Sequence, residues 1–182
     1  MSSKITMTIM CGLPRCGKST WIKRNKKDAV IVSPDEIRAK ILGHQFHPEA
    51  EGFVWAIAES MASLLLDQGK SIIIDATNIN FHSRGRWIKM AEKYNVKARI
   101  IWLKTSLKKC HDRNIKSEQG KKVPPEVISG MALNFQDPSI DLDKVDIIEI
   151  PKGRQKKHRD VFSNYYQKEV KQKMQEEQVN YD

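Results

Sequence analysis

The stretch TIMCGLPRCGKSTWI, residues 8–22, lies near the start of this 182-residue chain and decides its fold class. Residues 12–19, GLPRCGKS, match the pattern GxxxxGKS/T in full, between an apolar segment and a helical pattern, which is the context that the motif requires. Glycines let successive backbone N–H groups turn towards one anion, and the N-terminus of the following helix adds its positive end. A glycine turn that arose by chance would not need an apolar segment before it and a helical pattern after it. The stretch therefore predicts a P-loop, which holds the phosphates of a nucleotide.

Each position of the motif has an expected role. Lys18 should reach the β- and γ-phosphates, and the Ser19 hydroxyl should ligate a Mg²⁺ ion that bridges them. The segment TNIN, residues 77–80, does not match the guanine-reading pattern NKxD of GTPases. We therefore predict ATP with Mg²⁺ as the bound nucleotide, although the loop alone does not exclude GTP. The predicted nucleotide-binding residues of the loop are Gly12, Leu13, Pro14, Arg15, Cys16, Gly17, Lys18, Ser19 and Thr20.

Short apolar runs alternate with helical patterns along the rest of the chain. The continuous apolar run that ends at Asp75 is typical of a strand buried on both faces. Together with the P-loop, this alternation predicts an α/β protein of the P-loop NTPase fold, a parallel sheet flanked by helices. Strands are expected at 5–10, 29–32, 71–74, 96–103 and 145–150, and helices at about 50–68, 82–94, 106–116 and 125–134.

The helical pattern from Glu49 to Asp67 carries a stripe of large apolar side chains. We interpret it as a helix packed on the sheet, in preference to an aromatic platform for nucleic acid. The stripe consists of Phe53, Trp55, Ile57, Met61, Leu64, Leu65 and Leu66.

The charge balance points to an anionic partner. Lys and Arg number 32 against 22 acidic residues, a formal net charge of +10, which favours nucleic acid, nucleotide phosphate or acidic lipid, with simple solubility as the alternative. The three cysteines form no CxxC pair, so we expect free thiols in a reducing compartment. No apolar run approaches the ~20 residues that cross a membrane, and the first residues lack the apolar core of a signal peptide. We expect a cytoplasmic protein without membrane association.

The composition changes after Ile150. Residues 151–160, PKGRQKKHRD, form a polar basic hinge, and a charged, partly helical segment follows to the end of the chain. A solvated tail is the favoured interpretation. We therefore predict a P-loop domain at 1–150 and a basic C-terminal tail at 151–182, and leave the oligomeric state open.

The segment VSPDEIR, residues 32–38, supplies candidates for the acceptor side of the site. Ser33 can cap a helix whose first turn holds Pro34, Asp35 and Glu36. Asp35 has a second possible role, because a carboxylate after a parallel strand and near the P-loop can accept the proton of an attacking hydroxyl. Arg38, one turn later, could clamp a phosphate of the acceptor. Helix cap and general base both remain open for Asp35.

The segment IIIDATNIN, residues 72–80, supplies the remaining polar candidates. Asp75 could hold Mg²⁺ through a water molecule, orient the acceptor hydroxyl or support the P-loop. Asn78 is expected to tie these loops together, with an Asx turn as the alternative. Arg84 and Arg86 open the next helix and could either serve the acceptor or solvate that helix.

The order of four segments, GLPRCGKSTW, SPDEIR, IIIDATNINFHSRGR and CHDRNIKSEQGKKVPPEVI, resembles the 5′-hydroxyl polynucleotide kinase domain of phage and bacteria, over about residues 5–150. The resemblance implies that Asp35 is the general base and that Arg38 clamps the acceptor phosphate. It also implies a role in acceptor binding or site architecture for Asp75, Thr77 and Asn78.

The same resemblance implies a small helical lid that closes over ATP. The lid begins at Arg113 and Asn114, and Arg113 is expected to reach the transferring phosphates. Many members carry a second arginine a few residues later, whereas this chain has Lys121 and Lys122. A lysine can supply the charge but not the planar fork of arginine. The departure from the family pattern therefore affects the expected rate of catalysis more than the expected binding of ATP.

We predict a kinase that transfers the γ-phosphate of ATP to the 5′-hydroxyl end of DNA or RNA. Nucleic acid with a 5′-hydroxyl end is the expected partner, and a phosphatase or ligase would be a separate chain. A kinase of small metabolites or nucleosides and a non-catalytic, nucleotide-dependent nucleic-acid-binding module are the alternatives. The predicted catalytic residues are Asp35, Lys18, Arg113 and Arg38. The predicted acceptor-binding residues are Asp35, Arg38, Asp75, Asn78 and Arg84.

Overall fold

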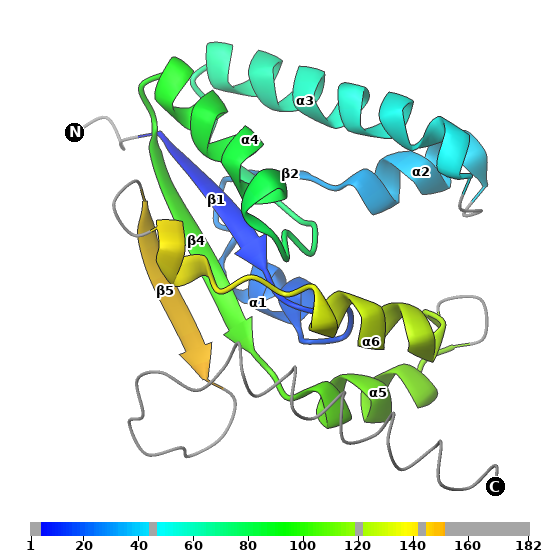
Figure 1. Ribbon diagram of the computed structural model, residues 1–182. Coiled ribbons are helices and arrows are strands. Elements are labelled where there is room, and N and C mark those ends of the chain that lie inside the picture. Colours follow the sequence, from blue (N-terminus) through cyan, green and yellow to red (C-terminus); the bar gives the residue numbers. More distant parts are fainter. Residues whose placement is uncertain (1–4, 44–46, 119–121, 142–144, 152–182) are drawn as a thin grey trace, which may run out of the picture.

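Five parallel strands form a single sheet in the computed structural model, which describes residues 5–43, 47–118, 122–141 and 145–151 (Figure 1). The strand order is β2-β3-β1-β4-β5, so the strand before the P-loop lies at the centre. The predicted strands and the P-loop NTPase fold are confirmed. The strands are β1 Thr6–Cys11, β2 Val30–Val32, β3 Ile72–Ile74, β4 Lys97–Lys104 and β5 Asp146–Pro151.

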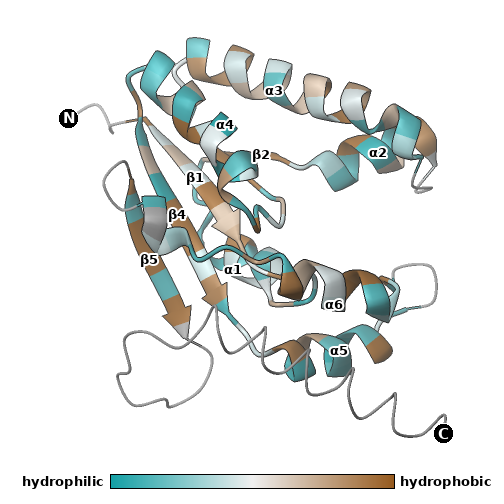
Figure 2. Cartoon of the chain, in the orientation of Figure 1, coloured by the Kyte–Doolittle hydropathy of each residue, from teal (hydrophilic) through white to brown (hydrophobic). Residues whose placement is uncertain are grey.

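The central strands form the core because their side chains are apolar on both faces. Ile9 of β1 pairs with Ile74 of β3 on one side and with Ile100 of β4 on the other, and all three are buried. Figure 2 shows hydrophobic colours on parts of β1 and β4. The carboxyl ends of β1, β2 and β3 therefore lie at the same edge of the sheet, and the loops that follow them meet there.

The helices enclose the sheet and its carboxyl edge. In Figure 1, α3 and α4 run side by side at the top of the view, and α5 and α6 lie together at the lower right. The carboxyl end of β1 lies between these two pairs. The helices are α1 Lys18–Asn25, α2 Pro34–Leu42, α3 Glu51–Asp67, α4 Phe81–Lys93, α5 Leu107–Ile115 and α6 Pro125–Leu133, with the short 3₁₀ helices η1 Pro48–Ala50 and η2 Pro138–Asp141.

The prediction that the whole apolar stripe of α3 packs in the core is wrong in part. The fully buried face of α3 consists of Val54, Ala58, Ala62 and Leu66, at spacings of four residues. The small alanines let the helix approach its neighbours closely. Three of the large side chains point to solvent instead, with exposed fractions of 58% for Phe53, 38% for Met61 and 62% for Leu64. Trp55, Ile57 and Leu65 are half-buried against the core.

The three cysteines are free and buried, as expected. Burial raises the pKa of the Cys11 thiol to about 12, although the nearby Arg84 opposes this shift. Cys11 is therefore protonated at neutral pH and unreactive. No helix in the described part of the chain is long and apolar enough to cross a membrane. The predicted tail lies outside the described residues from 152 onwards, so the domain boundary stays a prediction.

Candidate active site

The P-loop joins β1 to α1 and needs glycine at both conserved positions. Gly12 has a φ of 148° and Gly17 a φ of 110°, which L side chains rarely adopt. A Cβ atom on Gly12 would lie 2.7 Å from the Cys16 Sγ atom and 3.2 Å from the Leu103 carbonyl oxygen. The loop therefore has room for backbone only at this point. The predicted strand, loop and helix are in place.

The Lys18 ammonium group binds to carbonyl groups of this loop. Its Nζ atom donates hydrogen bonds to the carbonyl oxygens of Gly12 at 3.0 Å and of Leu13 at 2.9 Å. Ser19 and Thr20 follow on the first turn of α1, where both are exposed. An incoming triphosphate would compete with the two carbonyl groups for the ammonium. The cation and the hydroxyl groups of the motif thus lie together at the loop, where a phosphate would bind.

The lid helix α5 touches the P-loop through Arg113. The Arg113 Nη1 atom donates to the carbonyl oxygens of Arg15 at 3.0 Å and of Cys16 at 3.1 Å. The hydroxyl of Thr105, which follows β4 directly, also donates to the Cys16 carbonyl, at 2.9 Å. Thr105 was not predicted. Its position after a strand, at the same edge of the sheet as the P-loop, was the available signal.

Asn114 closes the connection between α5 and α6. Its Nδ2 atom donates to the Val123 carbonyl oxygen at 2.6 Å, and the Val123 N–H donates back to Asn114 Oδ1 at 3.0 Å. Asn114 is buried, so the structure gives it a role in shaping the lid. Lys121, a candidate for replacing the second lid arginine, lies outside the described residues, and Lys122 is exposed.

Three hydrogen bonds tie the loop after β3 to the end of β1 and to the first residue of the P-loop. The Gly12 N–H donates to the Thr77 carbonyl oxygen at 2.9 Å, the Asn78 Nδ2 atom to the Met10 carbonyl at 2.8 Å and the Cys11 thiol to the Asn78 carbonyl at 3.3 Å. Asn78 is 2% exposed. Through its side chain, Asn78 thus joins the loop after β3 to the end of β1, directly before the P-loop, which agrees in part with the expected tie between the two loops. Its side chain points into the protein, so any direct contact with an acceptor stays a prediction.

The residues predicted for the acceptor side include two members of a three-residue ion cluster. The Arg38 Nη1 atom lies 2.6 Å from the Asp35 Oδ1 atom. The opposite edge of the Arg38 guanidinium group binds both oxygens of Glu51, at 2.6 Å from Nε and 2.9 Å from Nη2. The Glu51 hydrogen bonds raise the pKa of Arg38 above its ordinary value. Glu51 comes from the first turn of α3, and its contact with α2 could not be seen in the sequence.

Asp35 is the exposed member of this cluster. Its side chain is 87% exposed, against 14% for Arg38 and 20% for Glu51. Ser33 caps α2 as predicted, through a hydrogen bond that its hydroxyl accepts from the Glu36 N–H at 3.3 Å. Asp35 is therefore not needed as the side-chain cap of this helix. An exposed carboxylate held by a half-buried arginine suits a group that meets a substrate.

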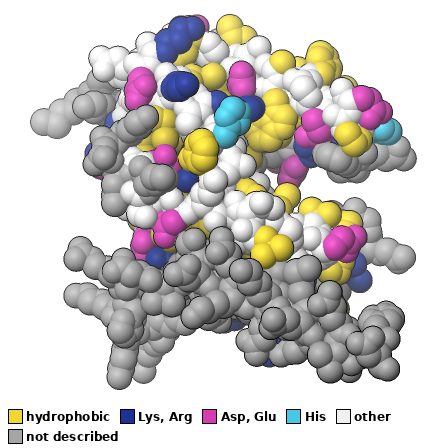
Figure 3. Space-filling model, in the orientation of Figure 1, with side chains coloured by type: hydrophobic (Ala, Val, Ile, Leu, Met, Phe, Trp, Pro, Cys, Tyr) yellow, Lys and Arg dark blue, Asp and Glu magenta, His cyan; other side chains and the backbone are white. Residues whose placement is uncertain are grey.

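Asp75 connects the acceptor side with the P-loop. Burial raises the pKa of the Asp75 carboxyl above its ordinary value, while the Lys18 ammonium opposes this shift. The carboxylates of Asp35 and Glu36 raise it further. These four side chains thus share one electrostatic environment, which joins the three predicted motifs. Figure 3 shows the surface hollowed between the part with α2 and α3 and the part with α5 and α6.

The raised pKa of Asp75 predicts an effect on stability. A carboxyl group with a raised pKa stabilises the fold below its ordinary value of 3.8, and this contribution is lost as the pH rises through the pKa in the folded state. We expect Asp75→Asn to raise Tm at pH 7, by about 2–4 °C for each kcal/mol relieved. At pH 3 the two proteins should melt alike. Asp67→Asn, at the exposed end of α3, is the control in the same calorimetric measurement. A lower Tm for Asp75→Asn at pH 7 would show that the ionised Asp75 carboxylate does not destabilise the fold.

Arg84 lies inside the protein. Its exposed fraction is 0%, its Nε atom lies 2.5 Å from Asp141 Oδ2, and its Nη1 atom donates to the carbonyl oxygens of Asn78 at 3.1 Å and Gln136 at 3.0 Å. The structure thus gives Arg84 a structural role that the sequence did not reveal, holding the loop after β3 against η2. Its predicted contact with the acceptor is not supported by this placement. Arg86 pairs with Glu59 at 3.1 Å on the surface.

The residues present fit a magnesium ion held mainly by the nucleotide. The described part of the chain contains no group of three or more His, Cys, Asp or Glu side chains that could hold a metal. Mg²⁺ at kinase sites is usually bound by phosphates, waters and one or two protein oxygens. Ser19 and, through a water molecule, Asp75 could supply those oxygens. Mg²⁺ would neutralise charge on the β- and γ-phosphates.

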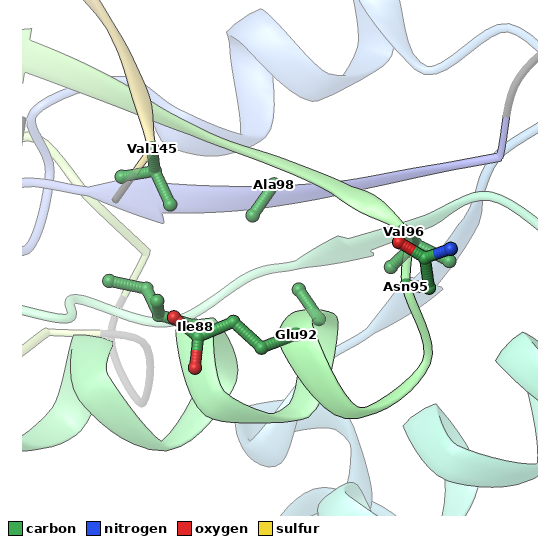
Figure 4. Close-up of a pocket in the computed structure, with 7 residues that line it drawn as sticks. Ile88, Glu92, Asn95, Val96, Ala98 and Val145 are labelled. Atoms are coloured by element: carbon green, nitrogen blue, oxygen red, sulfur yellow. The ribbon is translucent and has the colours of Figure 1, made fainter. Parts of the chain in front are cut away.

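A cavity of about 210 Å³ lies at the opposite end of the sheet (Figure 4). It opens between the second half of α4 and the start of β4, and Ile88, Glu92, Val96 and Val145 are among its lining residues. The P-loop follows the other end of the neighbouring strand. This cavity is therefore separate from the candidate active site.

Comparison with known proteins points to kinases. A family profile described as an AAA domain matches residues 7–138. L-seryl-tRNA(Sec) kinase of Methanococcus maripaludis is 32% identical over 142 residues, which cover 72% of this chain and 53% of that protein. Bifunctional polynucleotide phosphatase/kinase of Schizosaccharomyces pombe is 26% identical over 105 residues, which cover 56% of this chain and 26% of that protein. The chain thus spans about half of the first relative and a quarter of the second.

Solved structures show the same fold. The chain aligns with the structure of the Pnkp1/Rnl/Hen1 RNA repair complex with a TM-score of 0.69 and 22% identity, over 88% of this chain and 53% of that chain. At this identity the likeness establishes the fold of the P-loop domain alone.

Proposed function

Because the chain belongs to the AAA domain family and carries the P-loop of a kinase, we propose that it transfers the γ-phosphate of ATP to the 5′-hydroxyl end of a polynucleotide. The observation that carries this proposal is the exposed Asp35 carboxylate, held at 2.6 Å by Arg38. Asp35 and the P-loop lysine both influence the pKa of Asp75, which supports their being near each other. This arrangement supports a role for Asp35 as the base near the phosphate loop. The names of the two relatives, kinases of a tRNA and of a polynucleotide, support nucleic acid as the acceptor class.

In the proposed reaction, the 5′-oxygen forms a bond to the γ-phosphorus as the bond from that phosphorus to the β,γ-bridging oxygen breaks. Asp35 takes the proton of the attacking hydroxyl. Lys18 and Arg113 stabilise the charge on the moving phosphoryl group, and a magnesium ion held at Ser19 would supply further positive charge there. ADP and the 5′-phosphorylated end are the products.

Arg38 has a double role in this proposal. Its Nη1 atom orients Asp35, and its positive charge attracts the phosphate next to the terminal nucleoside. Since Glu51 binds the Nε and Nη2 atoms in a bidentate manner, it fixes the plane of the guanidinium group. Glu51 is therefore a positioning residue: by fixing Arg38, it orients both Asp35 and the acceptor phosphate.

We expect Glu51→Gln to raise the KM for a 5′-hydroxyl oligonucleotide by about 10–100-fold, because hydrogen bonds to charged groups contribute about 1.5–3 kcal/mol. The Kd for ADP should stay within about threefold, since Glu51 does not contact the P-loop. Initial rates at varied acceptor concentration give the KM. Glu49→Gln is the matched control, because Glu49 is 78% exposed and pairs only weakly, with His47 at 3.5 Å. An unchanged acceptor KM in Glu51→Gln would refute its positioning role.

A panel of acceptors tests the proposed function. Label from [γ-³²P]ATP is followed into 5′-hydroxyl DNA and RNA oligonucleotides, free nucleosides and small sugars. Transfer to an oligonucleotide in preference to nucleosides supports the proposal and decides between DNA and RNA. Transfer to nucleosides or sugars alone would establish the small-molecule kinase instead. Salt-sensitive oligonucleotide binding without any transfer would establish a binding module.

The hydroxyl of an aminoacyl group on tRNA is a second candidate acceptor. It is favoured by the relative with the higher identity, L-seryl-tRNA(Sec) kinase, which matches a larger share of this chain than the polynucleotide kinase does. The same P-loop and the same base would serve either hydroxyl. Label that is released from seryl-tRNA by mild alkali, together with the amino acid, would identify this acceptor.

A further inference from the structure

The Cys16 carbonyl group of the P-loop is held from two sides. Thr105 donates to it from the end of β4 at 2.9 Å, and Arg113 donates to it from α5 at 3.1 Å. Arg113 uses the same nitrogen for the Arg15 carbonyl at 3.0 Å. Thr105 is 1% exposed, and its own N–H donates to the Leu103 carbonyl at 3.0 Å. Its hydroxyl is thus fixed to the sheet, whereas Arg113 belongs to the lid.

The orientation of this carbonyl group decides where the next N–H group points. All described peptide bonds are trans, and in a trans peptide the C=O and N–H groups point in opposite directions. With the Cys16 carbonyl turned towards Thr105 and Arg113, the Gly17 N–H points to the other side of the loop. Inward-pointing N–H groups of this kind bind the anion in a P-loop.

We infer that Arg113 exchanges its contacts with the loop for a contact with the phosphate. In the proposed function it reaches the phosphate that is transferred, and in the structure its Nη1 atom is engaged with two carbonyl oxygens of the loop. When Arg113 moves to the γ-phosphate, the Cys16 carbonyl loses one of its two donors. Thr105 is the donor that stays, because it is anchored at the end of β4.

We propose that Thr105 is a positioning residue which keeps the Cys16 carbonyl, and with it the Gly17 N–H, in place when Arg113 leaves the loop for the γ-phosphate. The inference rests on the proposed role of Arg113 in phosphate transfer. It does not depend on the identity of the acceptor. Its consequence is that the Thr105 hydroxyl matters more when a γ-phosphate is present than when it is absent.

Nucleotide affinities measured by calorimetry test this inference. ADP with Mg²⁺ leaves Arg113 on the loop, and a non-hydrolysable ATP analogue with Mg²⁺ draws it away. We expect Thr105→Val to raise the Kd for the analogue about tenfold, because a buried acceptor loses its remaining donor. The Kd for ADP should change by less than about threefold, since Arg113 still holds the carbonyl. Thr105→Ser keeps the hydroxyl and should restore both values.

Two further variants separate positioning from a general loss of packing. Thr8→Val removes another buried threonine hydroxyl, on β1, which accepts a hydrogen bond from Arg99 Nε at 3.0 Å. This variant should leave both Kd values unchanged. In an Arg113→Gln background, Thr105→Val should weaken ADP and the analogue to the same extent, because neither state then has the arginine.

Equal effects of Thr105→Val on ADP and on the analogue in the Arg113 protein would overturn the proposal, as would no effect on either. If Thr105→Val does not fold, Thr105→Ala is used in the same comparison. A failure of these measurements leaves the test of polynucleotide transfer intact, because no acceptor is present in them.

Discussion

Asp35→Asn is expected to lower kcat for phosphate transfer by about 10²–10⁴-fold, the usual contribution of a general base. Asparagine keeps the size of the side chain and an oxygen that can accept the hydrogen bond from Arg38 Nη1, but it cannot take up the proton. The P-loop is untouched, so the Kd for ATP should stay within about threefold of the original value. Single-turnover rates with a 5′-hydroxyl acceptor, measured beside ATP titrations, give the two quantities separately.

Glu36→Gln is the matched control for this prediction. Asp35 and Glu36 both lie in the first turn of α2, where either carboxylate favours the positive end of the helix by about 0.3–1 kcal/mol. If Asp35 acted only through the helix, the two substitutions would lower the stability equally and leave kcat alike. A loss of transfer in Asp35→Asn alone identifies the base. Equal rates in both variants would remove Asp35 from the reaction.

The second large effect is expected at Lys18. Lys18→Met removes the ammonium group that lies on the Gly12 and Leu13 carbonyl oxygens and should lower kcat/KM by at least about 10²–10³-fold, as for other donors that stabilise transition-state charge. ATP should also bind more weakly, because the charge that meets the β- and γ-phosphates is gone. Transfer rates at varied ATP concentration and calorimetric ATP binding check the two parts.

Lys23→Met is the control for Lys18, because Lys23 lies on the same helix but is exposed at its far end. It should leave both ATP binding and transfer within about threefold, since an exposed charge so far from the phosphates is screened. ATP affinity and transfer that survive in Lys18→Met would contradict the assignment of the P-loop. Loss of both in Lys23→Met would instead point to damage to helix α1.

The parts of the fold that the sequence predicted are those set by local pattern. The P-loop requires glycine at 12 and 17 because both backbones have a positive φ, and such a constraint is visible in the sequence itself. The strand at Ile72–Ile74 was predictable because a strand buried on both faces is apolar throughout. The cap of α2 by Ser33 is equally local, since both partners lie within four residues.

The parts that were missed or wrong depend on partners distant in the sequence. Glu51 meets Arg38 only because α3 packs beside α2, and Thr105 meets Cys16 across 89 residues of chain. Arg84 has the sequence context of a surface cation at the start of a helix, yet Asp141 lies 57 residues away and pairs with it in the interior. The α3 stripe misled for a related reason, because the fully buried face of the helix includes two alanines, while Phe53, Met61 and Leu64 of the stripe are exposed.

Four cationic side chains at or beside the candidate site bind protein oxygen atoms in the structure. Lys18 and Arg113 lie on carbonyl oxygens of the P-loop, Arg38 lies between two carboxylates, and Arg84 pairs with Asp141. We propose that ATP and Mg²⁺ release the first two towards the phosphates, whereas Arg38 and Arg84 keep their partners. Binding of nucleotide would then rearrange the P-loop and the lid but leave the acceptor side as it is.

Transfer of label to one defined end tests the central proposal most directly. The protein is incubated with [γ-³²P]ATP, Mg²⁺ and an equal mixture of one oligonucleotide with a 5′-hydroxyl and a longer one with a 5′-phosphate. Label on the 5′-hydroxyl strand alone, at its 5′ end after nuclease digestion, and absent with Asp35→Asn, is the predicted result. ATP binding without label on any strand would contradict it.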